Sequence, residues 1–176
     1  MSAVPPDLPM SQPPLSHQDF TRAFRDALGM FATGIAVVTT RAPNGEAIGL
    51  TVNSFNSVSL DPPLIVWSLS RHLASLPVFE ACEYYAVNVL AEDQQHLSQL
   101  FATRSDDKFA GIDIDDGLYG VPLLKDCCAR FECRNTTRHP GGDHLVFISE
   151  VVRFDRISER PPLIYHSGAY RRLAAG

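Results

Sequence analysis

The sequence lacks the features that mark membrane, secreted and nucleic-acid-binding proteins. No apolar run approaches the ~20 residues that a membrane-spanning helix needs. The net charge of −5 is spread along 176 residues, and no basic stripe or polybasic segment stands out. The N-terminus has no charged segment followed by an apolar one, as a secretory signal would. We therefore expect a cytoplasmic protein that binds neither a membrane nor nucleic acid.

The sequence is also poor in metal-binding and catalytic motifs. Its four cysteines are Cys82, Cys127, Cys128 and Cys133, and none forms a C-x-x-C pair. Since a zinc site would need closer pairing and nearby histidines, free thiols and no metal are predicted. No nucleophile elbow, P-loop, H-E-x-x-H or dinucleotide fingerprint occurs. If the protein is an enzyme, a bound cofactor is therefore expected to supply the reactivity.

One polar segment, residues 49–63, stands out against these absences. It begins like a strand, ends at Pro62-Pro63, and holds six uncharged hydrogen-bonding residues: Thr51, Asn53, Ser54, Asn56, Ser57 and Ser59. Burying such groups without partners would cost about 1–3 kcal/mol each, so the segment is poor core material. It suits a flat, uncharged, hydrogen-bonding ligand. A solvated Ser/Asn-rich loop is the alternative that composition leaves open.

The hydrophobic content of 45% fits one globular domain. Residues 1–16 hold five prolines and predict a disordered leader, which leaves 17–176 as the domain. Ser16 with Asp19 reads as a capping box that opens an amphipathic helix. The apolar residues of that helix recur at helical spacing: Phe20, Ala23, Phe24, Ala27, Leu28 and Phe31.

Strand-like segments dominate the rest of the chain. Strands are expected at 34–40, 47–52, 64–69, 84–90 and 163–166, and a long hairpin at 129–136 and 144–154. Short helices are expected at 73–82, interrupted by Pro77, and at 92–103, whereas 104–126 reads as loop. The pattern predicts a mainly β protein, a Greek-key barrel with a few peripheral α-helices.

Motifs spread over residues 20–173 together resemble the short-chain flavin reductase family. The segments that carry the resemblance are 31–40, 49–63, 86–90, 101–102, 107–109, 131–133, 142–144, 162–165 and 168–170. The resemblance implies a split β-barrel that binds FMN or FAD, usually as a homodimer. It also implies hydride transfer from NADH or NADPH to flavin, and transient hand-off of reduced flavin to a monooxygenase.

Site residues are then proposed from the resemblance. Thr51, Val52, Asn53 and Ser54 are expected along the isoalloxazine, with hydrogen bonds from backbone and side chains. Ser57 and Ser59 are expected near the ribityl chain or phosphate. Ser70 and Ser75 flank an expected helix start, where amides attract phosphate.

Two cations and two ring-bearing residues complete the expected site. Arg104 and Lys108 are proposed to offset phosphate charge, although solvated surface charges are the alternative. His144 follows a Gly-Gly turn and is expected as the catalytic residue at the nicotinamide side. Tyr170 is expected to cover the same site, and ordinary structural roles remain alternatives for both rings.

Three functions remain open at this stage. The first is an NAD(P)H:flavin oxidoreductase that supplies reduced flavin to a partner oxygenase. The second is a non-enzymatic protein that stores or senses flavin. The third is a reductase with a non-flavin acceptor, such as a corrin or a ferric complex.

Overall fold

The computed structural model describes residues 16–105 and 107–173. The predicted leader therefore lies, apart from Ser16, outside the described residues. In chain order the elements are α1 (His17–Gly29), β1 (Thr33–Gly34), β2 (Ala36–Arg41), β3 (Ala47–Val52), β4 (Asn56–Leu60), β5 (Pro63–Ser70), α2 (Leu76–Ala81), β6 (Tyr84–Val89), η1 (Glu92–Gln94), α3 (Gln95–Ala102), β7 (Ile114–Asp116), η2 (Leu118–Gly120), β8 (Pro122–Leu124), β9 (Ala129–Gly141), β10 (His144–Arg156), β11 (Ile164–His166) and β12 (Ala169–Arg171).

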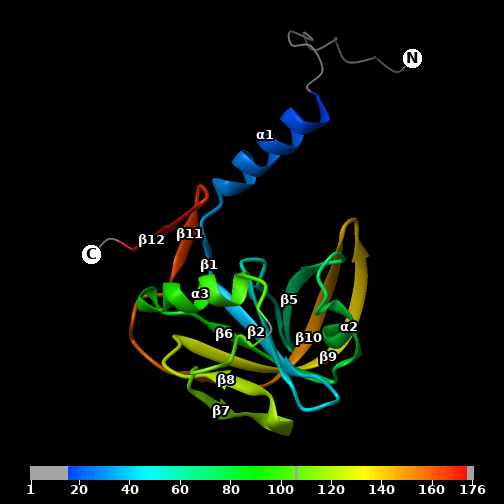
Figure 1. Ribbon diagram of the computed structural model, residues 1–176, viewed down its shortest axis with the longest axis vertical. Coiled ribbons are helices and arrows are strands. Elements are labelled where there is room, and N and C mark those ends of the chain that lie inside the picture. The colour runs from blue at the N-terminus through cyan, green and yellow to red at the C-terminus, as the bar shows by residue number, and fades with distance from the viewer. Residues whose placement is uncertain (1–15, 106, 174–176) are drawn as a thin grey trace.

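A seven-stranded antiparallel sheet, in the order β3-β2-β6-β9-β10-β5-β4, forms the body of the protein. Its strands curve around a core centred on Trp67, whose ring packs against Phe79, Tyr85 and Phe147. The core exists because alternate residues of β5 and β10 point inward, as the period of two along a strand requires. The expected mainly β barrel is confirmed (Figure 1), and Trp67 is fully buried in its core.

The long β9–β10 hairpin differs from its predicted form. Its strands run to the tip, where the turn is only Gly142-Asp143, and two register shifts interrupt the pairing of the two strands. Gly142 has a φ of 65°, a left-handed conformation that suits glycine at this tight turn. The tip therefore carries His144 as the first residue of β10.

Several short elements were not predicted. Strand β4 lies inside the polar segment 49–63, and the 104–126 region contains β7, η2 and β8. Strand β12 completes a three-stranded sheet with β1 and β11. The helix predicted at 73–82 is shorter, because Pro77 lies in its first turn rather than interrupting it. The predicted helix 92–103 divides into η1 and α3.

Helix α1 follows its predicted cap and spacing but projects away from the barrel, with β11 and β12 at its foot (Figure 1). The Ser16 hydroxyl accepts a hydrogen bond of 3.1 Å from the Asp19 amide. None of the residues of α1 is buried. Across 16–105 and 107–173, no helix combines the length and the apolar character that crossing a bilayer demands.

Candidate functional site

A cavity of about 790 Å³ opens between β3, the turn before α2 and the end of α3. Three stretches separated in sequence line it: residues 46–51, 71–78, and 101–105 with Lys108. Its volume lies within the ~300–1,000 Å³ typical of small-molecule and cofactor pockets. We therefore take this cavity as the candidate site, because its size suits a cofactor and three separate chain segments meet in it.

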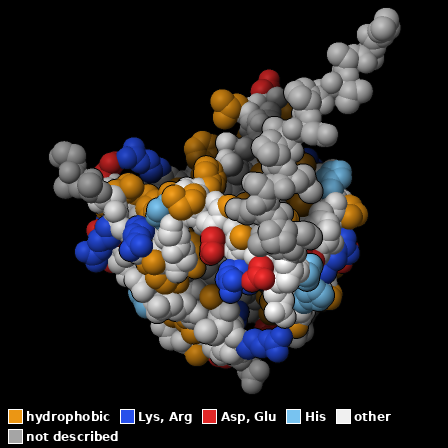
Figure 2. Space-filling view, turned by 90° about the horizontal axis from the view of Figure 1, so that it is seen from above, with side chains coloured by type: hydrophobic (Ala, Val, Ile, Leu, Met, Phe, Trp, Pro, Cys, Tyr) orange, Lys and Arg blue, Asp and Glu red, His pale blue; other side chains and the backbone are white. Residues whose placement is uncertain are grey.

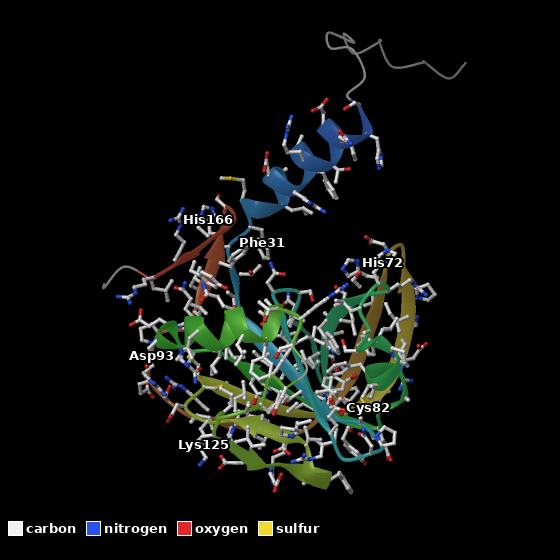
Figure 3. All side chains as sticks on the ribbon, viewed as in Figure 1. Phe31, His72, Cys82, Asp93, Lys125 and His166 are labelled. Atoms are coloured by element: carbon white, nitrogen blue, oxygen red, sulfur yellow. The ribbon has the colours of Figure 1, made fainter. Side chains whose placement is uncertain are left out.

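The turn at 71–75 is held in place by the distant tip of the β9–β10 hairpin. The Arg71 amide donates a hydrogen bond of 2.9 Å to the Asp143 carbonyl, and Arg71 Nε donates at 3.3 Å to the His144 carbonyl. Ser75 is the N-cap residue of α2, but its side chain makes no capping bond. Figure 3 shows His72 beside this hairpin tip. One wall of the cavity thus depends on the hairpin.

The opposite wall is closely packed around Gly49. A Cβ at this position would lie 2.7 Å from Phe101 Cε1 and 3.2 Å from Phe109 Cζ. The rings of Phe101 and Phe109 meet edge to face, with 5.0 Å between their centroids. Glycine in β3 therefore allows the end of α3 to approach the strand closely.

The ammonium group of Lys108 lies in this wall. Its Nζ donates hydrogen bonds to the carbonyls of Phe101, at 2.9 Å, and Gly49, at 3.3 Å. Partial burial lowers the pKa of Lys108 from its usual value, because desolvation disfavours the charged form. Two carbonyls leave one ammonium proton for an anionic ligand.

The cavity combines an apolar floor with a cationic rim. Apolar lining comes from Ala47, Ile48, Leu50, Leu73, Ala74, Leu76, Pro77, Val78, Phe101 and Ala102. Arg71, Arg104 and Lys108 supply positive charge, against Glu46 as the acid among the described lining residues. Such a pocket suits a ligand with a flat apolar body and at least one anionic group.

Four of the predicted site residues line this cavity together: Thr51, Ser75, Arg104 and Lys108. The Thr51 hydroxyl donates a hydrogen bond of 2.6 Å to the Ser98 carbonyl of α3. Its side chain therefore fastens β3 to α3, and the Thr51 backbone is the part left to face a ligand.

The other predicted residues of the polar segment do not line the cavity. Val52 is buried in the barrel core, and Asn53 is exposed. The Ser54 hydroxyl is taken up by the Ser68 backbone, donating to its carbonyl at 3.2 Å and accepting from its amide at 3.0 Å. Ser57 and Ser59 lie on β4, where a register shift separates them.

Ser70 and His144 lie opposite each other at the ends of β5 and β10. The Ser70 hydroxyl accepts a long hydrogen bond of 3.4 Å from the His72 amide. His144 Nδ1 lies 2.8 Å from Asp143 Oδ1, and this contact lowers the pKa of the Asp143 carboxyl. The His144 side chain is 42% exposed and is not among the residues that line the cavity, but its carbonyl accepts the hydrogen bond from Arg71, which is.

Tyr170 lies on β12, outside the cavity lining. Its hydroxyl lies 3.0 Å from the Ser98 hydroxyl, and its ring meets Tyr165 edge to face. The Ser98 carbonyl also accepts the hydrogen bond from the Thr51 hydroxyl. Tyr170 is therefore connected to the cavity wall only indirectly, through Ser98 of α3. The four cysteines are free as predicted, with Cys127 and Cys133 buried.

Sequence reasoning did not single out Arg71, Gly49 or Glu46 as site residues. An isolated glycine in a strand is a signal for close approach, so Gly49 was open to prediction. Arg71 was not, because its place on the rim depends on hydrogen bonds to Asp143 and His144, which lie far along the chain.

Comparison with known proteins relates the chain to enzymes. Residues 28–174 match the family model described as "Flavin reductase like domain". FMN reductase (NADH) SmoA of Agrobacterium fabrum is 43% identical over 154 residues, which cover 88% of this chain and 87% of that protein. The reductase subunit HsaB of a Rhodococcus jostii flavin-dependent monooxygenase is 38% identical over 149 residues, covering 85% of this chain and 76% of that protein.

Solved structures agree with these relatives. The NADH:FAD oxidoreductase SgcE6 of Streptomyces globisporus, in complex with NAD and FAD fragments, superposes with a TM-score of 0.85 at 33% identity, covering 92% of this chain and 98% of that one. Flavin reductase PheA2 gives a TM-score of 0.79 at 39% identity, covering 88% and 98% of the two chains. The chain spans only 48% of the reductase component of the trigonelline monooxygenase of Acinetobacter baylyi.

Proposed function

This chain belongs to the flavin reductase-like domain family, and we propose that its cavity holds the flavin against β3 while NADH approaches from the side of the β9–β10 hairpin. The protein is an NADH-dependent flavin reductase that uses FMN or FAD, as its relatives do. Related chains serve as reductase subunits of two-component monooxygenases.

The observation that carries this proposal is the convergence of Thr51, Ser75, Arg104 and Lys108 on one cavity of about 790 Å³. The residues fit a flavin, because the apolar floor suits a flat ring system and the cationic rim suits a phosphate. Arg104 and the remaining Lys108 proton are proposed to bind that phosphate, with Ser75 as a neutral partner. The Gly49–Thr51 backbone is proposed to lie along the ring edge.

The chain's own work is binding and alignment. When bound, the flavin supplies the acceptor for a hydride from the nicotinamide, so no protein nucleophile is needed. The packed wall of Gly49 and Phe101 excludes water from one side of the cavity. His144, beside the rim, is proposed to orient the nicotinamide, and Asp143 would fix its ring through the contact to Nδ1.

The remaining predicted contacts are kept as proposals with altered roles. The backbone at the end of β3 is shaped by Val52, Asn53 and Ser54, which would affect the flavin only in this way. A ligand would contact Ser57, Ser59 and Ser70 only if it extended beyond the cavity. Tyr170 would support α3. Residues 17–176 are proposed to form one reductase domain.

Two partners are proposed. A homodimer is supported by the open edges of β3 and β4 at the ends of the main sheet, which present unpaired backbone groups. A flavin-dependent monooxygenase that receives the reduced flavin is supported by the names of the related reductase subunits.

The test measures NADH oxidation by the purified protein with and without added FMN or FAD, together with flavin fluorescence titration. Oxidation that depends on flavin, with flavin bound at micromolar affinity, is the expected result; a micromolar complex corresponds to about 8 kcal/mol. Flavin binding without NADH oxidation would favour a storage protein. Oxidation that needs a corrin or ferric acceptor and ignores flavin would favour the third function.

A further inference from the structure

Arg71 is connected to two parts of the proposed site at once. Its side chain belongs to the lining of the cavity, and its Nε donates the 3.3 Å hydrogen bond to the carbonyl of His144. Its backbone amide donates at 2.9 Å to the carbonyl of Asp143. The side chains of Asp143 and His144 meet at 2.8 Å, with Nδ1 of the ring facing the carboxylate. Arg71 therefore holds the backbone of the two residues that are proposed to set the geometry of the nicotinamide.

The hairpin tip that carries these two residues has few other restraints. The pairing of β10 with β5 ends at His144 and Ser70, and beyond it the tip pairs with no other strand of the described chain. No atom lies within 4 Å of a Cβ placed on Gly142, and the Asp143 side chain is 75% exposed. Turns with so few packing contacts are among the least stable parts of a protein. The contacts from Arg71 are therefore the brace that keeps the tip in one position.

Attraction of an anionic ligand is the other role that the charge of Arg71 suggests. Within 16–105 and 107–173 only Nε of its guanidinium has a partner, which leaves the terminal N–H groups for a ligand. The cavity already holds two other cations, Arg104 and Lys108. In the space-filling view of the end from which α1 projects, acidic and basic side chains are interspersed (Figure 2). Salt screens such a mixed field, so the directed contact with the tip is what sets Arg71 apart.

We propose that Arg71 is a positioning residue for hydride transfer: its Nε contact holds the hairpin tip so that the His144 ring is kept on the nicotinamide side. This inference rests on the role proposed above for His144. A small displacement of an orienting group slows a reaction, because the bound reactants leave their productive alignment. One exposed hydrogen bond contributes enough to change a rate about 3- to 10-fold.

Two variants separate the N–H donor from the charge. Glutamine carries its side-chain nitrogen on Cδ, as arginine carries Nε, so Arg71→Gln keeps a donor near the His144 carbonyl and removes the charge. Lysine has a carbon at that place, so Arg71→Lys keeps the charge and removes the donor. We expect kcat/KM for NADH to fall about 3- to 10-fold in Arg71→Ala and Arg71→Lys, but less than about 2-fold in Arg71→Gln. A lysine variant that is more active than the glutamine variant would overturn the inference.

A matched control removes the same charge elsewhere on β10. Arg156 lies at the opposite end of that strand and pairs with Glu159 on the surface. Arg156→Ala should leave the NADH kinetics at the wild-type level. Because Arg71 is exposed, its variants should also melt close to the wild-type temperature, which shows that a kinetic loss does not come from unfolding.

A double-mutant cycle tests whether Arg71 acts through His144. Arg71→Ala should change kcat/KM for NADH by less than about 2-fold in the His144→Ala protein, because no imidazole is left to position. An equal loss in both backgrounds would mean that Arg71 acts on the substrate directly, which overturns the inference and leaves the role of His144 standing. Normal NADH kinetics of His144→Ala would overturn the role of His144 itself and this inference with it. Flavin titration reports separately on the reductase.

A second readout needs neither flavin nor NADH. NMR relaxation of backbone amides gives an order parameter, which is about 0.85 for rigid backbone and below about 0.6 for flexible backbone. In the protein without ligands, the order parameters of Gly142 and Asp143 should fall in Arg71→Ala and Arg71→Lys and stay at the wild-type level in Arg71→Gln. A tip that is equally rigid in all four proteins would show that Arg71 is no brace, and the inference would be wrong.

Discussion

The Lys108 ammonium donates a 2.9 Å hydrogen bond to the carbonyl of Phe101, the residue whose ring packs over Gly49. This contact links the cation of the cavity rim to the packed wall behind it. A change at Lys108 should act mainly on the charge offered to the ligand, and a change at Gly49 mainly on packing against Phe101.

Replacing Lys108 by alanine should weaken flavin binding more than it slows turnover. A contact to a phosphate far from the reacting atoms contributes equally to ground and transition states, so KM for flavin should rise with kcat nearly unchanged. Steady-state kinetics measure this directly. Lys125→Ala is the matched control, since Lys125 is the chain's other lysine and lies outside the cavity lining. A large loss of kcat at saturating flavin would assign Lys108 a different role.

Replacing His144 by alanine should lower kcat/KM for NADH by about 1–3 kcal/mol, roughly 5- to 150-fold. The proposed role is to orient the nicotinamide, so loss of the ring should impair turnover without abolishing it, and flavin affinity should change much less. His139→Ala, on the same hairpin and exposed, is the control. A variant with normal NADH kinetics and a lower melting temperature would make His144 a structural residue.

Adding a methyl group at Gly49 should destabilise the protein by about 1–3 kcal/mol. The new Cβ would lie 2.7 Å from Phe101 Cε1, and Phe101 is buried, so the ring has little room to move. Urea unfolding of Gly49→Ala measures the loss. Gly34→Ala should cost much less, because no atom lies within 4 Å of a Cβ there. Combining Gly49→Ala with Phe101→Leu should recover part of the stability if the clash is the cause.

Stability should fall as the pH rises above about 9. Burial raises the pKa of the Cys127 thiol to about 12, and burial also raises the pKa of Cys133 and of Tyr85. The unfolded chain releases these protons near the ordinary values, while the folded chain keeps them. Folded protein therefore binds more protons, and stability decreases by about 1.4 kcal/mol per pH unit for each such group.

Urea unfolding between pH 8 and pH 11, in the presence of a reductant, measures this slope. Cys127→Ala removes one of the groups, so its slope should be shallower than that of the wild type above pH 9. An identical slope in both proteins would mean that Cys127 does not contribute.

The predictable parts of the fold are those whose signals are local. Ser16, Asp19 and the apolar spacing define α1 without any tertiary information, and the short apolar, β-prone run at 64–69 defines most of β5. Strand β4 has no such signal, since its residues are polar or exposed and its identity comes from pairing with β5. The projection of α1 away from the barrel was likewise not readable, because periodicity gives a face and not its partner.

The sequence allowed some residues of the candidate site to be predicted, but not how the fold arranges them. Lys108 and Arg104 were identified as cations, and the cavity lining includes both. Ser54 was proposed as a ligand contact, yet its hydroxyl is taken up by the backbone of Ser68 on the neighbouring strand. Such competition between a ligand and the protein's own backbone depends on a strand pairing that no local pattern reveals.

The β11–β12 hairpin contacts two helices that are far apart in the sequence: the Ser167 amide donates to Gly29 at the foot of α1, and the Tyr170 hydroxyl contacts Ser98 of α3. During synthesis, therefore, α3 lacks its Tyr170 contact until β12 has left the ribosome. Strand β5 must also wait for β10, which leaves the Trp67 side of the core without its Phe147 neighbour in a nascent chain. Flavin binding should accordingly appear only after β10 and β12 have been synthesised.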